Sequence, residues 1–357
     1  MQTDFQDHMP KPYEAADIIL IDTQNDYAIK TIDRTLGWNF QQGTMMYWNP
    51  DAPETQFFFN DRDPGTNKIF TVLFDISKGK RIREYRYEDT PIGNSGVAQN
   101  GKYFLGLNYG RLARLRLVTG YPGAYDWTIG EKFPTTDGIF KIKITTGERQ
   151  LLVSYRQLYN AIRKNHPEVE EKELFINHTL WNRDDDRIFF VVRADFSDKE
   201  HRLNIPFTIN SDGNGLTEQK KIIGGHPEWE FGHRMFSTPD KKLMIFDTDS
   251  QMNVKQIGDS SIFPKPGGDK ALSPDGNWLV CGYNMNSYIT YVLYRLSDGV
   301  WLKTKSIYQR GYDTGALRND PAPCWNRDGT QILFPAITTD ANESRQLYII
   351  NLSAGDK

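Results

Sequence analysis

Apolar residues recur along the whole chain in short strand-like runs, and many of these runs follow a polar turn directly. Six copies of this turn-and-strand phrase begin at Asn49, Ala98, Asn182, Thr238, Ser273 and Asn326. Pro, Asp, Asn and Gly preset the dihedral angles of the turn, and the β-branched and aromatic residues that follow favour a buried strand. Each copy therefore predicts a β-hairpin.

A second phrase, in which an alternating strand leads through a polar turn into another strand, falls between the first ones. Its copies begin at Ile69, Gly138 and Thr290. Two hairpins make a four-stranded sheet, and a repeat of about 55 residues is near the period of β-propeller blades. The pattern therefore predicts an all-β, seven-bladed β-propeller in which six blades are read directly. The interval between Ala98 and Asn182, which also contains a short helical pattern, leaves room for the seventh.

The two ends of the chain each have strands that lack a partner in the repeat. The last repeat stops after the strand that begins at Gln346, whereas residues 17–22 and 27–32 form strands before any inner hairpin. An N-terminal strand that pairs in the C-terminal blade would close the ring and remove an exposed sheet edge. We expect this closure, a single domain over residues 1–357 and a flexible segment over residues 1–16. A β-sandwich or two small β domains is the alternative, but no Pro/Gly/Ser-rich linker interrupts the repeat.

Charge and composition narrow the classes of partner. The chain has 43 Lys and Arg against 46 Asp and Glu and no long block of one sign, so we expect no nucleic acid partner. It has no run of about 18 apolar residues, so we expect no membrane span. The N-terminal residues lack the apolar core of a signal peptide. Cys281 and Cys324 form neither a CxxC pair nor a disulfide framework, and they do not define the redox compartment.

Candidate chemistry is expected where the innermost strands of the blades begin, because these positions converge on the central channel of a propeller. His178, His226 and Asp269 precede three of the turn phrases. Two imidazoles and a carboxylate suit one divalent cation, such as calcium, and suit proton transfer equally well. The alternative is that each side chain only hydrogen-bonds its neighbours. His233, which also precedes a turn phrase, is a candidate for substrate binding.

Two further segments have the composition of a sugar-binding surface. The segment 107–127 contains Tyr109, Arg111 and Tyr121, and guanidinium groups pair with carboxylates while aromatic rings pack on sugar rings. Water-facing arginines on an alternating strand are the alternative for this segment, although they do not explain the Gly-Tyr-Pro-Gly sequence around Tyr121. The other segment begins at Leu36. Its polar and aromatic side chains can bind a sugar but cannot act as acid or base, and structural packing explains their presence equally well. These residues are Trp38, Asn39, Gln41 and Gln42.

These residues resemble a family of bacterial propeller enzymes that attack uronate-containing polysaccharides. The family includes ulvan lyases, oligogalacturonate lyases and, more closely, the rhamnosidases and rhamnosyl-glucuronate lyases that act on arabinogalactan. The resemblance extends from about Trp38 to the C-terminus. It depends on the order of five short motifs: WNFQQGTMMYW from Trp38, LNYGRLARLR followed by GYPG, INH at 176–178 with Arg193 ending the next strand, SPDG at 273–276, and CWNRDG at 324–329.

The resemblance implies a set of catalytic residues. In such lyases an arginine or another polar group neutralises the uronate carboxylate, and a tyrosine or histidine removes the C5 proton. Carried over to this chain, the catalytic residues are Arg111, Tyr121, His178 and Arg193, and the substrate-binding residues are Trp38, Asn39, Gln41, Gln42, Tyr109 and His233.

The chain also departs from the family pattern. Relatives commonly carry His where this chain has Val192, Asp269 and Ala322, which implies an incomplete metal cluster. The rhamnosidases are thought to use a histidine near the position of Gln41 and Gln42, so the substitution argues against hydrolysis by that route.

The leading hypothesis is a monomeric, secreted or periplasmic enzyme that binds an acidic polysaccharide. It removes terminal L-rhamnose from α-1,4-linked D-glucuronate of arabinogalactan by β-elimination. A rhamnosidase homologue with weakened or lost hydrolytic activity is one alternative. A non-catalytic propeller that binds glycan or protein is another, and an oligogalacturonate lyase is a third, which would need a more complete set of metal ligands.

Overall fold

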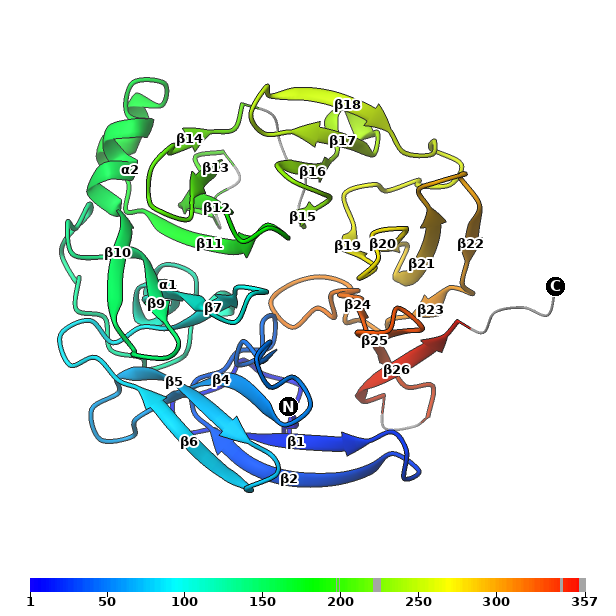
Figure 1. Cartoon of the computed structure of the whole chain (residues 1–357), viewed down its shortest axis with the longest axis horizontal. Coiled ribbons are helices and arrows are strands. Elements are labelled where there is room, and N and C mark those ends of the chain that lie inside the picture. The colour runs from blue at the N-terminus through cyan, green and yellow to red at the C-terminus, as the bar shows by residue number, and fades with distance from the viewer. Residues whose placement is uncertain (197, 199, 221–225, 341–342, 353–357) are drawn as a thin grey trace. The chain divides into compact units, whose positions relative to one another are not determined.

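The alternating apolar runs form antiparallel strands in the computed structural model, which describes residues 1–196, 198, 200–220, 226–340 and 343–352. The chain forms two compact units, Met1–Glu218 and Gln219–Lys357. In both units, consecutive strands of the chain lie side by side in the sheets, as Figure 1 shows. The six predicted hairpins that begin at the turn phrases are confirmed, because each phrase connects two paired strands.

The first unit contains three four-stranded sheets with the strand order of propeller blades. The first is β3 (Tyr47–Trp48), β4 (Gln56–Arg62), β5 (Ile69–Asp75) and β6 (Lys80–Tyr85). The second is β7 (Gly93–Val97), β8 (Tyr103–Leu107), β9 (Gly138–Lys143) and β10 (Arg149–Ser154). The third is β11 (Phe175–Trp181), β12 (Arg187–Ala194), β13 (Leu203–Asn210) and β14 (Thr217–Glu218).

The middle strands of these sheets are buried on both faces. Every residue of β5 is buried, and β12 is buried from Ile188 to Ala194. A strand with no exposed face must be covered on both sides, which explains why its sequence reads as a nearly continuous apolar run. Aromatic side chains from neighbouring sheets, such as Phe58 and Phe104 with ring centroids 6.0 Å apart, fill the space between them.

The long interval between the second and third turn phrases contains helices. Helix α1 (Tyr109–Leu115) follows β8, and α2 (Tyr155–Ile162) follows β10. Ser154 and Gln157 form a capping box that satisfies backbone N–H groups at the start of α2. The described strands of this interval belong to the second and third sheets, so its length is explained by the helices and their loops. A seventh blade stays a prediction.

The described part of the second unit contains three sheets. One is β15 (Glu228–Trp229), β16 (Arg234–Ser237), β17 (Met244–Asp247) and β18 (Met252–Gln256). The next is β19 (Asp269–Leu272), β20 (Trp278–Met285), β21 (Tyr288–Arg295) and β22 (Trp301–Lys303), with β23 (Ile307–Tyr308) also paired to β21. The last is β24 (Cys324–Trp325), β25 (Gln331–Ile337) and β26 (Arg345–Asn351).

The two N-terminal strands pair with each other, and the pairing of one of them in the C-terminal blade stays a prediction. β1 (Ala16–Asp22) pairs with β2 (Ala28–Thr35) in a sheet of two strands, and β26 pairs with β25 in a sheet of three. The physical reason is local: the turn between β1 and β2 lets the two strands form a hairpin, which satisfies their hydrogen bonds without a distant partner.

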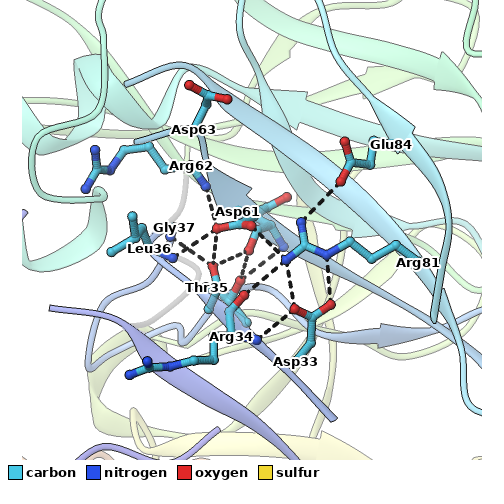
Figure 2. Close-up of polar contacts among 12 residues, drawn as sticks. Asp33, Arg34, Thr35, Leu36, Gly37, Asp61, Arg62, Asp63, Arg81 and Glu84 are labelled. Atoms are coloured by element: carbon cyan, nitrogen blue, oxygen red, sulfur yellow. Dashed lines mark hydrogen bonds and ion pairs between the residues drawn. The ribbon is translucent and has the colours of Figure 1, made fainter. Parts of the chain in front are cut away.

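An ion-pair network holds β2 against the first blade (Figure 2). The Arg81 guanidinium, on β6, pairs with the Asp33 carboxylate at 2.8 Å and with the Asp61 carboxylate at 2.9 Å. Asp61, on β4, also accepts hydrogen bonds from the Thr35 hydroxyl and from the Leu36 N–H. Gly37 passes so close to β4 that an added Cβ would lie 2.9 Å from the Asp61 carbonyl carbon. The network therefore directs the segment after β2 across the first blade.

Candidate functional site

A cavity of about 220 Å³ lies in the first unit. Its wall is formed by the segment that leads into β3, by β7, by β8 with α1, and by β11, so all three blades of the unit contribute. The lining residues are Gln42, Met45, Tyr47, Ser95, Leu107, Tyr109, Leu112, Asn177, His178, Thr179 and Leu180. Three predicted site residues therefore share one cavity: Gln42, Tyr109 and His178.

His178 reaches the cavity through a β-bulge. The pairing register of β11 with β12 shifts between Asn177 and Leu180, and His178 has a φ of 56°. A left-handed backbone is costly for a non-glycine residue, and bulges commonly re-aim a side chain next to an active site. The His178 N–H donates a hydrogen bond of 2.9 Å to the Asn177 side-chain oxygen. The bulge thus places a half-buried imidazole in the wall of the cavity.

The neighbouring strand β7 has a bulge at the matching position. Its register with β8 shifts between Asn94 and Gly96. The Thr179 hydroxyl, next to His178, donates to the Ser95 carbonyl oxygen at 2.8 Å and lies 2.8 Å from the Ser95 hydroxyl. The two irregular strands therefore brace each other and hold two hydroxyl groups at the cavity.

The segment 38–42 supplies an amide to the same wall. The Asn39 side-chain oxygen accepts hydrogen bonds from the N–H groups of Gln41 and Gln42 at 3.0 and 2.7 Å, which fixes a tight turn. The Gln42 side chain then donates to the Asn177 side-chain oxygen at 3.1 Å. Trp38 is buried, and its indole N–H donates to the Glu14 carbonyl. Within this segment Gln42 lines the cavity, whereas Trp38 and Asn39 support the turn.

Two stacked tyrosines form another part of the wall. The rings of Tyr109 and Tyr121 are 4.1 Å apart and nearly parallel, and Tyr121 is fully buried behind Tyr109. The Tyr109 hydroxyl donates to the Asn94 carbonyl, and Asn60 donates to the Tyr121 hydroxyl. Burial raises the pKa of both phenols above the ordinary value. Neither ionises near neutral pH, so Tyr109 is a hydrogen-bond donor or an acid rather than a base.

Arg111, a predicted catalytic residue, is fully buried in the structure. Its segment forms helix α1, so the alternative of an alternating strand with water-facing arginines is wrong. The guanidinium donates to the carbonyl oxygens of Leu174, Glu131 and Lys132 and to the Thr128 hydroxyl. It therefore ties the loop after α1 to the start of the third blade. A role of Arg111 in the reaction stays a prediction.

Arg193, the other predicted catalytic arginine, ends β12 and is buried. Its Nε–H donates to the Asn204 side-chain oxygen at 2.7 Å. Burial, with repulsion from Arg116 and Arg202, lowers the pKa of Arg193 to about 9. The described lining of the cavity contains amides, hydroxyls, an imidazole and phenols, and Arg193 belongs to a separate cluster of arginines.

The remaining predicted residues lie in the second unit. His226 and Asp269 form an ion pair, and burial lowers the pKa of the adjacent Lys270 ammonium. The His233 imidazole pairs at 2.6 Å with the carboxylate of Asp249, which lies in the turn between β17 and β18. In the part of the chain that the structure describes, no group of three or more His, Cys, Asp or Glu side chains is arranged to hold a metal ion. The described residues thus offer no metal-ligand set, and the divalent cation stays a prediction.

Sequence reasoning missed four of the polar residues in the cavity wall. They are Tyr47, Ser95, Asn177 and Thr179. Tyr47 and Asn177 lie inside two of the motifs on which the family resemblance depends, so those motifs could have identified them. Ser95 and Thr179 gave no signal, because their place in the wall follows from the two bulges, and a bulge cannot be read from the strand pattern.

Comparison with known proteins gives the fold. No family model matches the chain, and no curated protein matches it. Among solved structures, oligogalacturonate lyase from Vibrio parahaemolyticus has a TM-score of 0.60 at 13% identity, over 96% of this chain and 85% of that one. The β-propeller domain of Cps50 (Swd1) from Myceliophteria thermophila has a TM-score of 0.50 at 11% identity, over 95% and 87%. TolB from Acinetobacter baumannii has 0.47 at 12% identity, over 96% and 76%.

The similarity to the propeller structures and the succession of blade-like sheets confirm the predicted β-propeller class. At these identities the comparisons show the fold alone, and the reaction must be argued from the cavity. None of the helices in the described part of the chain has the length and apolar character that crossing a membrane requires.

Proposed function

We propose that the cavity in the first unit cleaves a uronate-containing glycan by β-elimination. The observation that supports this most strongly is His178, an imidazole held in a left-handed bulge among tyrosine, amide and hydroxyl groups. Proteins keep such a conformation where the surrounding structure over-determines it, and functional sites are where it is commonly found. That a fold neighbour is an oligogalacturonate lyase favours the same class of substrate.

The proposed reaction needs one base and one acid. Removal of the C5 proton by the His178 imidazole leaves an electron pair that forms the C4–C5 double bond as the bond from C4 to the leaving oxygen breaks. Tyr47, the half-exposed phenol of the cavity wall, gives its proton to that oxygen. A neutral imidazole is available as a base near pH 7, whereas the buried Tyr109 phenol is not.

The neutral groups of the wall bind and orient the sugar. The Gln42 and Asn177 amides, which hydrogen-bond each other, and the Ser95 and Thr179 hydroxyls offer donors and acceptors to sugar hydroxyls and to the carboxylate. A donor to the carboxylate favours the charge that builds up on it as the C5 proton leaves. The buried Tyr109 ring, stacked on Tyr121, supports this wall from behind.

The substrate follows from the family resemblance and is tested by direct comparison. We propose a terminal rhamnosyl-α-1,4-glucuronate as the unit that is cleaved, in a secreted or periplasmic setting. The purified protein is incubated with a rhamnose-capped arabinogalactan and, in parallel, with oligogalacturonate. Elimination gives an unsaturated uronate, which absorbs ultraviolet light, whereas hydrolysis releases rhamnose without that absorbance.

Each result of this comparison decides one part of the proposal. Absorbance with the arabinogalactan supports the rhamnosyl-glucuronate lyase. Absorbance with oligogalacturonate alone moves the substrate to galacturonate and keeps the elimination. Rhamnose without absorbance shows a hydrolase, and no product from either glycan contradicts the proposed function.

A further inference from the structure

A second cavity, of about 270 Å³, lies in the first unit between its second and third blades. Its wall includes Asn100, Tyr103, Lys141, Trp181, Asp185 and Ser211. Tyr103 begins β8, whereas Leu107, which ends β8, lines the cavity that contains His178. A strand advances about 3.3 Å per residue, so the two cavities lie about 13 Å apart along this strand, at its opposite ends.

Two half-buried aromatic side chains, Tyr103 and Trp181, give this second cavity an apolar part. The Trp181 indole N–H donates to the Gly96 carbonyl oxygen at 3.2 Å, which fixes one edge of the ring against β7. The Lys141 ammonium lies 5.0 Å from the centre of the Tyr103 ring and covers one face of it. The Trp181 ring is therefore the apolar surface on which a ligand can pack.

The polar part of the wall contains an ammonium and a carboxylate that are both held in place. The Lys141 ammonium donates to the Ser211 carbonyl oxygen at 2.5 Å. The two Asp185 side-chain oxygens accept hydrogen bonds from the N–H groups of Gln99 and Asn100, at 2.8 and 2.7 Å. An ammonium donates more than one hydrogen bond and a carboxylate accepts more than two, so both groups can also bind a ligand hydroxyl.

The charges around the second cavity have both signs. Burial lowers the pKa of the Lys141 ammonium, and the nearby Asp212 carboxylate opposes this shift. Burial raises the pKa of the Asp185 carboxyl group, and Lys102 stands at the exposed rim. A charged ligand would meet a like charge in this wall, and an apolar ligand would bury charged groups without new hydrogen bonds, which is costly. A neutral ligand with many hydroxyl groups suits both charges.

We propose that this second cavity binds one neutral sugar unit, whose ring packs on Trp181 and whose hydroxyl groups bind Lys141 and Asp185. Its volume is just below the roughly 300–1,000 Å³ of pockets for drug-sized ligands, which suits a single sugar ring. The site takes no part in cleavage, because it lies at the other end of β8 from the cavity that contains His178. Only the identity of the glycan rests on the proposed function.

The indole N–H signal of Trp181 reports on this cavity directly. In the two-dimensional NMR spectrum of the indole groups, it is the signal that is missing from W181F. Wild type is titrated separately with D-galactose, L-arabinose, L-rhamnose and D-glucose. We expect at least one of these sugars to shift the signal saturably, with a Kd of about 1–10 mM for a ligand of this size. No saturable shift with any of the four overturns the proposal.

K141M separates binding at this cavity from binding elsewhere. Methionine keeps most of the apolar stem and removes the ammonium, so we expect the affinity for the sugar to fall about 10-fold or more. The other indole signals must keep their wild-type positions, which shows that K141M folds. K265M is the matched control, because the Lys265 ammonium also donates to a backbone carbonyl, that of Asn284 at 3.0 Å in the second unit.

K265M should bind the sugar as tightly as wild type. Equal affinity in wild type and K141M would show that the sugar does not bind at Lys141, and this result overturns the proposal. H178N should also keep the wild-type affinity, because His178 lies in the other cavity. Loss of the Trp181 shift in H178N would assign the sugar to that other cavity and would likewise overturn the proposal.

Charged sugars test the class of ligand. Glucuronate carries a carboxylate and glucosamine an ammonium on a similar ring. If either shifts the Trp181 signal saturably and no neutral sugar does, the neutral assignment is overturned. Saturable binding of a neutral sugar by a protein that cleaves neither glycan would support the sugar site and contradict the lyase, so the two proposals fail separately.

Discussion

At the scale of single residues, the site depends on side chains whose surroundings decide their role. His178 lies in a bulge with a positive φ and lines the cavity. Tyr121 lies behind Tyr109 and supports the cavity wall. Arg111 and Arg193 belong to the same chemical class, but carbonyl oxygens satisfy the first, whereas other arginines surround the second. The sequence thus tells which chemistry a side chain is capable of, but only the fold tells whether that side chain serves the site or the structure.

Asp137 provides a test of burial at this scale. It is fully buried beside Asn108, and burial raises its pKa to about 7. The folded protein therefore keeps a proton that the unfolded chain loses near pH 4. The contribution of Asp137 to stability is fully present below about pH 4 and is lost as the pH rises towards 7. In wild type, the free energy of unfolding should therefore contain a component that falls over this range.

The D137N variant removes this component, because asparagine does not titrate. Urea unfolding at several pH values between about 4 and 7 should give a flatter pH dependence for D137N than for wild type. The slopes are compared rather than the absolute stabilities, since the hydrogen bond to Asn108 also changes. Equal slopes in the two proteins would mean that Asp137 is ionised throughout this range.

At the scale of elements, the sequence predicts the hairpins well and the bulges poorly. The turn phrases at Asn182 and Ser273 contain Asp, Asn, Pro or Gly next to an apolar run, so both strands of each hairpin are specified locally. The pairing of β1 with β2 follows from the same local preference. The bulges in β7 and β11 could not be predicted, because they depend on contacts between the two strands.

Arg81 tests how the N-terminal hairpin is held on the first blade. R81M removes the ion pairs to Asp33 and Asp61, and it leaves the mostly buried Asp61 carboxylate without its guanidinium partner. We expect a loss of about 1–3 kcal/mol, between the values for exposed and buried pairs. The control is R295M, which breaks an exposed pair with Asp298 and should change stability by less than about 0.5 kcal/mol.

The free energy of unfolding in urea measures both variants. If R81M and R295M lose the same small amount, the network in Figure 2 does not hold the hairpin. A larger loss in R81M alone supports the assigned role, because both variants remove one guanidinium and differ in the burial of its partners.

At the scale of the whole molecule, the repeated sequence phrases predict the fold, whereas the cavity forms where the blades of the first unit meet. The repeated phrases predicted a propeller class that the oligogalacturonate lyase and Cps50 (Swd1) structures confirm, although their identity to this chain is only 13% and 11%. Gln42, Tyr109 and His178 are far apart in the chain and line one cavity. The sequence pointed to these three through their positions and the composition of their segments, and the family resemblance added to this, but it could not separate them from Trp38 or Arg111, which are buried for structural reasons.

The central claim is that His178 removes a proton from the substrate in the cavity of the first unit. It is tested most directly by the rate of unsaturated uronate formation in H178N. Asparagine tolerates the left-handed backbone at this position, so the fold is kept while the base is removed. H166N, which changes a half-exposed histidine paired with Glu218, is the matched control.

The account predicts that H178N lowers kcat by about 10²–10⁴-fold, the usual contribution of a general base, whereas H166N keeps the wild-type rate. Circular dichroism and Tm close to those of wild type must accompany the loss in H178N. An H178N protein that forms the unsaturated product at the wild-type rate would contradict the account.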